Sequence, residues 1–318
     1  MDVSEWQKRL VDTFSTDEIV GKRLMAIIEM EKAYGLHVVN GYHGYRVLTD
    51  SFFDFYMETL QAANDWISMN GFPSDVPSYS SVFLFYVMSF RRLRAAENLF
   101  LCGYPMDGYA LLRDMKDRAI CMGAIMNRLG SFSSLYLGER HIDDQEKTLT
   151  RDEYIAVSKH RAKKERAVRK QMIGEDSGLT AEQIYELKQW DKLFHEEVHG
   201  SRFSYFMEGG PWLKGEKPLS LGPLPEEKTI GMYMNRNNEI CWMNLRTLPF
   251  LQLEPRAFGK EWARKWYVLD DSFRITVEGL GHMDKKIAWA IIALVDQKFR
   301  FSPEEMYFET DQPVKVEP

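Results

Sequence analysis

The sequence predicts an all-α protein built as a helical bundle. Apolar residues recur at spacings of three and four through most of the chain, which is the period of an amphipathic helix. Long alternating patterns typical of strands are scarce. Glycine- and proline-rich segments separate the periodic stretches, as turns between helices do.

The N-terminal part predicts two helices. Ser15 to Glu18 reads as a helix cap with acidic residues in the first turn, and an amphipathic run follows with Gly35 as its expected end. Residues 42–69 form an aromatic-rich helix. The segment 71–78 contains glycine, two prolines and two serines, which is typical of a loop.

A central antiparallel helical hairpin is expected next. Residues 80–102 and 106–129 are both long and apolar at helical spacing, and Gly103, Tyr104 and Pro105 break the pattern between them.

The second half continues with a basic helix over 152–173 and a helix from Thr180, its expected cap, to about residue 198 or 199 before Gly200. An irregular loop is expected over 209–225, and helices over 230–248 and 283–301. We predict four parts: 1–75, an N-terminal helical segment; 76–205, a core bundle; 206–310, a C-terminal helical segment packed on the core; and 311–318, a flexible tail.

Composition sets broad limits on function. The 318 residues carry a net charge of -6, which disfavours a broad non-specific affinity for nucleic acid but leaves room for a local basic patch. The three cysteines are scattered and favour reduced thiols. The N-terminus has no signal-peptide pattern, and the apolar run 287–295 is too short to span a bilayer. We therefore expect a cytoplasmic protein with no membrane partner.

The most chemically suggestive segment is His195-Glu196-Glu197-Val198-His199, which fits the H-E-x-x-H pattern. Two histidines one helical turn apart can bind Zn²⁺, and Glu196 would act as general base on a zinc-bound water. His195 and His199 are thus candidate metal ligands and zinc a candidate cofactor. In the alternative interpretation both histidines lie beside the apolar stripe at a helix end and make ordinary hydrogen bonds.

Two segments carry a family resemblance. The first runs from Arg94 to Asp117 and contains Leu111-Leu112-Arg113 with an acidic residue four positions after the arginine; the second runs from Trp190 to Ser201 and ends in His199-Gly200-Ser201. Together they resemble a widespread family of uncharacterised bacterial helical proteins, with Asp117 in place of that family's usual glutamate. The resemblance covers roughly residues 80 to 205 and implies an all-α bundle.

Some relatives in that family are thought akin to HEPN-type helical ribonucleases of toxin and phage-defence systems. Such nucleases carry arginine four to six residues before histidine, and none of the seven histidines here has an arginine at that distance. The resemblance therefore implies an RNA site in which Arg113 and His199 meet across helices, with Asp117 beside them. The alternative is that Arg113 and Asp117 form an i,i+4 ion pair.

One strong basic run spans residues 159–170. It is a candidate contact for nucleic acid or a partner through the following residues: Arg161, Lys163, Lys164, Arg166, Arg169 and Lys170. The alternative is a solvated helix that faces an acidic segment such as 143–146.

The leading hypothesis is a helical protein of a toxin or phage-defence type that acts on RNA through Arg113 and His199. Two alternatives stay open: a zinc metalloprotease that uses the HEEVH segment, and a non-catalytic protein-protein interaction module. A protein partner or homo-oligomer is expected, and RNA is a candidate partner.

Overall fold

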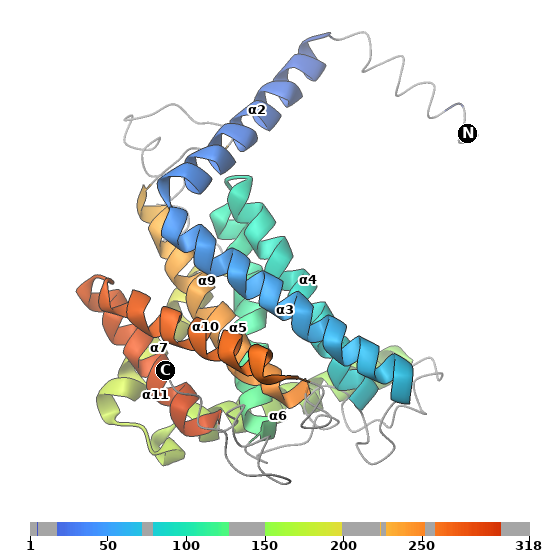
Figure 1. Ribbon diagram of the computed structural model, residues 1–318, viewed down its shortest axis with the longest axis vertical. Helices are drawn as coiled ribbons and strands as arrows, with labels where there is room; N and C mark the ends of the chain where they lie inside the picture. The colour runs from blue at the N-terminus through green and yellow to red at the C-terminus, as the bar shows by residue number, and fades with distance from the viewer. Residues whose placement is uncertain are drawn as a thin grey trace.

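The computed structural model confirms the all-α class. It describes residues 5, 18–71, 79–126, 150–198, 223, 227–251 and 258–299, and every regular element within these ranges is helical. The α-helices are α2 (Glu18–Gly41), α3 (His43–Asn70), α4 (Tyr79–Leu101), α5 (Pro105–Met126), α6 (Arg151–Ile173), α7 (Ala181–Val198), α9 (Glu227–Thr247), α10 (Lys260–Glu278) and α11 (His282–Lys298). Figure 1 shows α2 projecting from a bundle formed by the others.

The predicted central hairpin is confirmed. Helices α4 and α5 pack against each other, and α5 also contacts α6, α7 and α9. Gly103 between them has φ of 88°, a backbone conformation that favours glycine. A Cβ at this position would also lie 2.0 Å from the Cβ of Pro223, so the turn requires glycine for space as well.

Aromatic side chains fill much of the core where helices distant in sequence meet. Phe100 of α4 stacks on Tyr233 of α9, with ring centroids 4.3 Å apart, and Tyr109 of α5 meets the same tyrosine edge-on at 5.8 Å. Both Phe100 and Tyr233 are fully buried. This packing joins the hairpin to the C-terminal helices through one continuous apolar core.

A buried polar network lies beside this core and joins α3, α4 and α9. Glu97 has no exposed surface. It accepts hydrogen bonds from the Tyr45 hydroxyl at 2.8 Å and the Asn237 amide at 3.2 Å, and it forms an ion pair with Arg46. Asn237 also donates to the Tyr45 hydroxyl at 2.7 Å. Burial raises the pKa of Glu97, while Tyr45 and Arg46 oppose that rise.

The predicted cap of α7 is confirmed, and a cap that was not predicted from the sequence opens α6 one residue before its expected start. Thr150 accepts a hydrogen bond from the backbone of Glu153, whose carboxylate in turn accepts from the Thr150 backbone, so a capping box opens α6. Thr180 and Gln183 form the same reciprocal pair at the start of α7.

Two expectations were wrong. Gly35 does not end the first helix, because α2 continues to Gly41. Its role is close packing: a Cβ there would lie 2.9 Å from the carbonyl oxygen of Leu101. Helix α10, whose buried face carries Trp262, Trp266 and Phe273, was not expected from the sequence.

No helix in the described part of the chain is long and apolar enough to cross a membrane. The expected loop 209–225, apart from Pro223, and the expected tail 311–318 lie outside the described residues.

Candidate nucleic-acid interface

A row of basic side chains runs along one face of α6. Lys159, Lys163, Arg166 and Lys170 follow one another at spacings of four, three and four, so they share a helix face over roughly 16 Å. All four are exposed. We call these four residues the basic stripe.

The basic stripe faces away from the bundle. Val168 and Met172, on the opposite side of the same helix, are buried, and α6 packs on α5 and α11. Among the residues that the structure describes, Lys159, Lys163 and Lys170 form no ion pair, and Arg166 donates only to the Ala162 carbonyl oxygen at 3.2 Å. Within the described residues, no carboxylate therefore neutralises the three lysines of the stripe.

A second set of charges holds α6 against the bundle. Arg169 of α6 donates to Asp191 of α7 at 2.7 Å and forms an ion pair with Asp117 of α5. Lys116 of α5 forms an ion pair with Asp191 and lies 3.7 Å from Asp117. We call these four residues the acid–base cluster. It ties three helices together and fixes the rotation of α6 that turns the basic stripe outward.

Within the cluster, Lys116 has an unusual environment. Its side chain is 1% exposed, and its ammonium lies 4.9 Å from the ring centroid of Phe194 and 5.2 Å from that of Trp190. Burial lowers the pKa of Lys116, although Asp117 and Asp191 oppose the shift. Burial would also raise the pKa of Asp191, but Lys116 and Arg169 outweigh it and lower that pKa. Lys116 and Arg169 therefore favour the ionised form of the Asp191 carboxylate.

A further set of polar contacts links Trp190 of α7 to α9 and α11. Its indole N–H donates to Glu239 of α9 at 2.8 Å, and Arg236 donates to the same carboxylate at 2.7 Å. Arg236 also forms an ion pair with Asp284 of α11. Burial raises the pKa of Glu239 to about 7, although Arg236 opposes the rise. These contacts brace α7 against α9 and α11.

The structure separates residues that the sequence grouped together. Lys163, Arg166 and Lys170 belong to the basic stripe, whereas Arg169 joins the acid–base cluster. Lys164 is half-buried, and the side chain of Arg161 lies outside the described residues.

The structure describes two of the candidate catalytic residues, Arg113 and Asp117. Asp117 is half-exposed and contacts Lys116 and Arg169. Arg113 lies one turn earlier on α5 and is half-buried. The structure thus brings Asp117 together with Arg169, a residue that the sequence assigned to a different surface.

The HEEVH segment lies mostly outside the described residues. Helix α7 ends at Val198, the side chains of His195 and Glu196 are not described, and neither is His199. Position 195 follows Asp191 by one helical turn. Among the side chains that are described, no group of three His, Cys, Asp or Glu residues is placed to hold a metal ion. The acidic segment 143–146 is likewise outside the described ranges.

Scans against protein-family models, curated proteins and solved structures each found no match. The described residues define an all-α bundle in which the basic helix α6 packs on α5 and α11.

Sequence reasoning missed Lys116 and Asp191. Lys116 stands at an apolar position of α5, between the buried Leu112 and Ala119 on the same face, and a charge there signals a buried ion pair. Asp191 follows Trp190 in α7, a helix whose expected packing rested on its apolar positions alone. Their pairing depends on the packing of α5 on α7.

The acid–base cluster gives a stability prediction. We expect Asp191→Ala to lower the free energy of unfolding by about 2 kcal/mol, because the buried Lys116 ammonium loses its close carboxylate. The value is below the roughly 3–5 kcal/mol of fully buried pairs because Asp191 is 48% exposed. Lys116→Met should cost less, since Arg169 still neutralises both carboxylates and methionine fills the aromatic site. Urea unfolding of both variants checks the order, and a larger loss in Lys116→Met would contradict this account.

Proposed function

We propose that this protein binds RNA through the sugar-phosphate backbone, with the basic stripe on α6 as the contact surface. The observation that carries the proposal is the geometry of the stripe. Four exposed bases share one face, and the described residues supply no carboxylate to pair with the three lysines. Phosphate contacts of this kind supply most of the sequence-independent affinity of nucleic-acid-binding proteins.

The overall charge agrees with a local contact. With a net charge of -6, the chain as a whole repels a polyanion, so attraction must come from a restricted surface. The stripe spans roughly 16 Å, which corresponds to about four or five nucleotides of a strand. A single-stranded or looped RNA has the backbone flexibility to follow such a row.

Cleavage of the bound RNA is the further part of the proposal. Arg113 would hold a phosphate and His199 would act as general base, in a protein of a toxin or phage-defence type. This part rests on the resemblance around Leu111-Leu112-Arg113 and His199-Gly200-Ser201. Binding and cleavage are separable, because the stripe shares no residue with the candidate cleavage pair.

The test measures both steps on one RNA. Fluorescence anisotropy with a labelled single-stranded RNA at about 50 mM salt should show saturable binding below about 100 µM protein. Gel analysis of the same RNA should show cleavage that His199→Ala abolishes while the affinity stays unchanged. Absence of binding over this range overturns the proposed function, and binding without cleavage by the unaltered protein overturns its catalytic part.

A further inference from the structure

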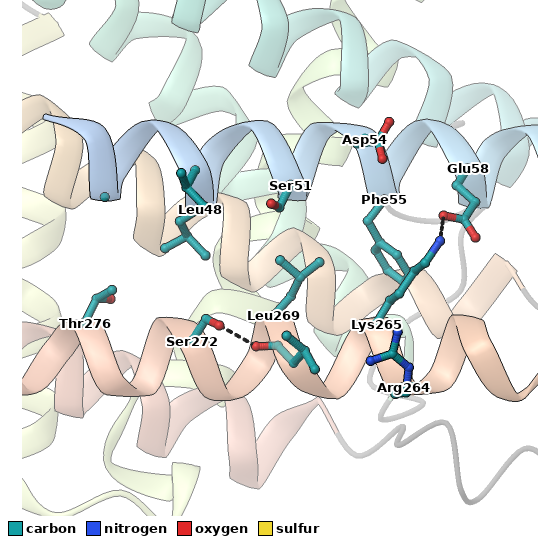
Figure 2. A pocket seen from close by; sticks show the side chains of 13 residues that line it. Leu48, Ser51, Asp54, Phe55, Glu58, Arg264, Lys265, Leu269, Ser272 and Thr276 are labelled. Atoms are coloured by element: carbon teal, nitrogen blue, oxygen red, sulfur yellow. Dashed lines mark hydrogen bonds and ion pairs between the residues drawn. The ribbon is translucent and has the colours of Figure 1, made fainter. Parts of the chain in front are cut away.

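A groove lies between α3 and α10, on a different part of the molecule from the basic stripe. Its volume is about 520 Å³, and the helices run antiparallel along its two sides. Figure 2 shows Glu58 beside Lys265 at one end, with Leu48 opposite Ser272 and Thr276 toward the other. We call this feature the α3–α10 groove.

The floor and edges of the groove are apolar. Leu48, Phe55 and Leu269 line it from below, and Val47 and Val268 at its edges are each 52% exposed. Several exposed apolar side chains next to a concave surface are typical of a contact site.

The two walls of the groove carry opposite charge. Asp54 and Glu58 line the α3 side, while Arg264 and Lys265 line the α10 side. The Glu58 carboxylate accepts from the Lys265 ammonium at 2.6 Å across one end of the groove. Arg264 also pairs with Glu261 of its own helix at 2.6 Å.

From this arrangement we infer that the α3–α10 groove binds a second copy of the same chain. Consider two molecules related by a twofold axis that runs along the groove. The α3 wall of each copy then lies over the α10 wall of the other, so acidic Asp54 and Glu58 face basic Arg264 and Lys265 twice. The four helices enclose the two grooves as the core of a four-helix bundle.

This pairing is self-complementary in a way that other arrangements are not. A twofold axis across the middle of the groove would place α3 over α3 and α10 over α10 in reversed direction. The charged ends of the two copies would then lie far apart, and Asp54 and Glu58 would meet no basic side chain of the other copy. The inference is independent of the proposed function, since it uses neither the stripe nor the acid–base cluster.

The test uses the mass in solution. Multi-angle light scattering of the unaltered chain should give twice the 37.2 kDa of one chain. The α3 variant (Asp54→Lys with Glu58→Lys) and the α10 variant (Arg264→Glu with Lys265→Glu) should each be monomeric, because like charges then meet at both contacts. An equimolar mixture should form the dimer again, since both contacts between the two variants are attractive.

The mixing experiment distinguishes the loss of contacts between two chains from a disturbance of the fold within one chain. Each variant also breaks the internal Glu58–Lys265 pair, and mixing cannot repair that contact. Helical circular dichroism checks that each variant is folded; if one is not, Val268→Glu takes its place and should be monomeric, with the exposed Met283→Glu as the matched dimeric control. A monomeric unaltered chain, a charge variant that stays dimeric, or a mixture that stays monomeric overturns the inference. The inference is also overturned if the chain is a monomer that binds a different protein through the groove.

Discussion

Replacing Lys159, Lys163, Arg166 and Lys170 together with glutamine is expected to lower the affinity for single-stranded RNA by about 100-fold at about 50 mM salt. Each side chain is exposed, and the three lysines form no ion pair with the described residues, so each charge is available to a phosphate. Four contacts release about three counterions from a single strand, which accounts for a loss of at least this size. Anisotropy titrations of the two proteins measure the ratio directly.

The matched control removes the same charge elsewhere. Lys32, Arg91, Lys188 and Lys260 are exposed bases on α2, α4, α7 and α10. Their combined replacement with glutamine changes the net charge by the same amount, and we expect an affinity within about threefold of the unaltered protein. Equal losses in both variants would show that total charge, rather than the stripe, governs binding.

Glu97→Ala should lower the free energy of unfolding by about 4 kcal/mol. Glu97 is fully buried, and its removal leaves the buried Tyr45 hydroxyl without an acceptor and Arg46 without its buried carboxylate. Arg46 keeps its pair with the exposed Asp50, and Asn237 still donates to Tyr45. Buried donors that lose their partner incur the full cost of desolvation. Urea unfolding followed by circular dichroism gives the value.

Two further variants test the cause of that loss. Glu97→Gln keeps an acceptor for Tyr45 and should cost about half as much, because only the charge is lost. Glu182→Ala removes an exposed carboxylate that pairs with the exposed Lys286, and we expect no measurable change in the free energy of unfolding. A loss below about 1 kcal/mol in Glu97→Ala would contradict a structural role for the network.

Much of the fold follows from local patterns. The cap at Thr180 and the break at Gly103 were predicted correctly, because capping and glycine turns depend on residues close in sequence. Gly35 was wrongly predicted to end a helix. Glycine is needed there because the backbone of Leu101 on α4 approaches closely. Helix α10 was missed although Trp262, Trp266 and Phe273 carry a helical period, because tryptophan-rich runs with many charges hide the apolar stripe.

The candidate interface was predictable as a basic helix but not in its orientation. Basic residues occur on most faces of the run 159–170, and the local sequence does not indicate which of Arg166 and Arg169 faces the solvent. Only the carboxylates of Asp117 and Asp191, on two other helices, decide that Arg169 turns inward. The α3–α10 groove could not be predicted either, because it forms between helices distant in the chain.

The central claim is that the basic stripe contacts phosphates, and the salt dependence of RNA binding tests it most directly. Four phosphate contacts predict that the logarithm of the association constant falls with the logarithm of salt concentration with a slope of about -3. The variant without the four stripe charges should give a slope near zero, while the control without Lys32, Arg91, Lys188 and Lys260 should keep the full slope. Equal slopes for the unaltered protein and the stripe variant would contradict the claim.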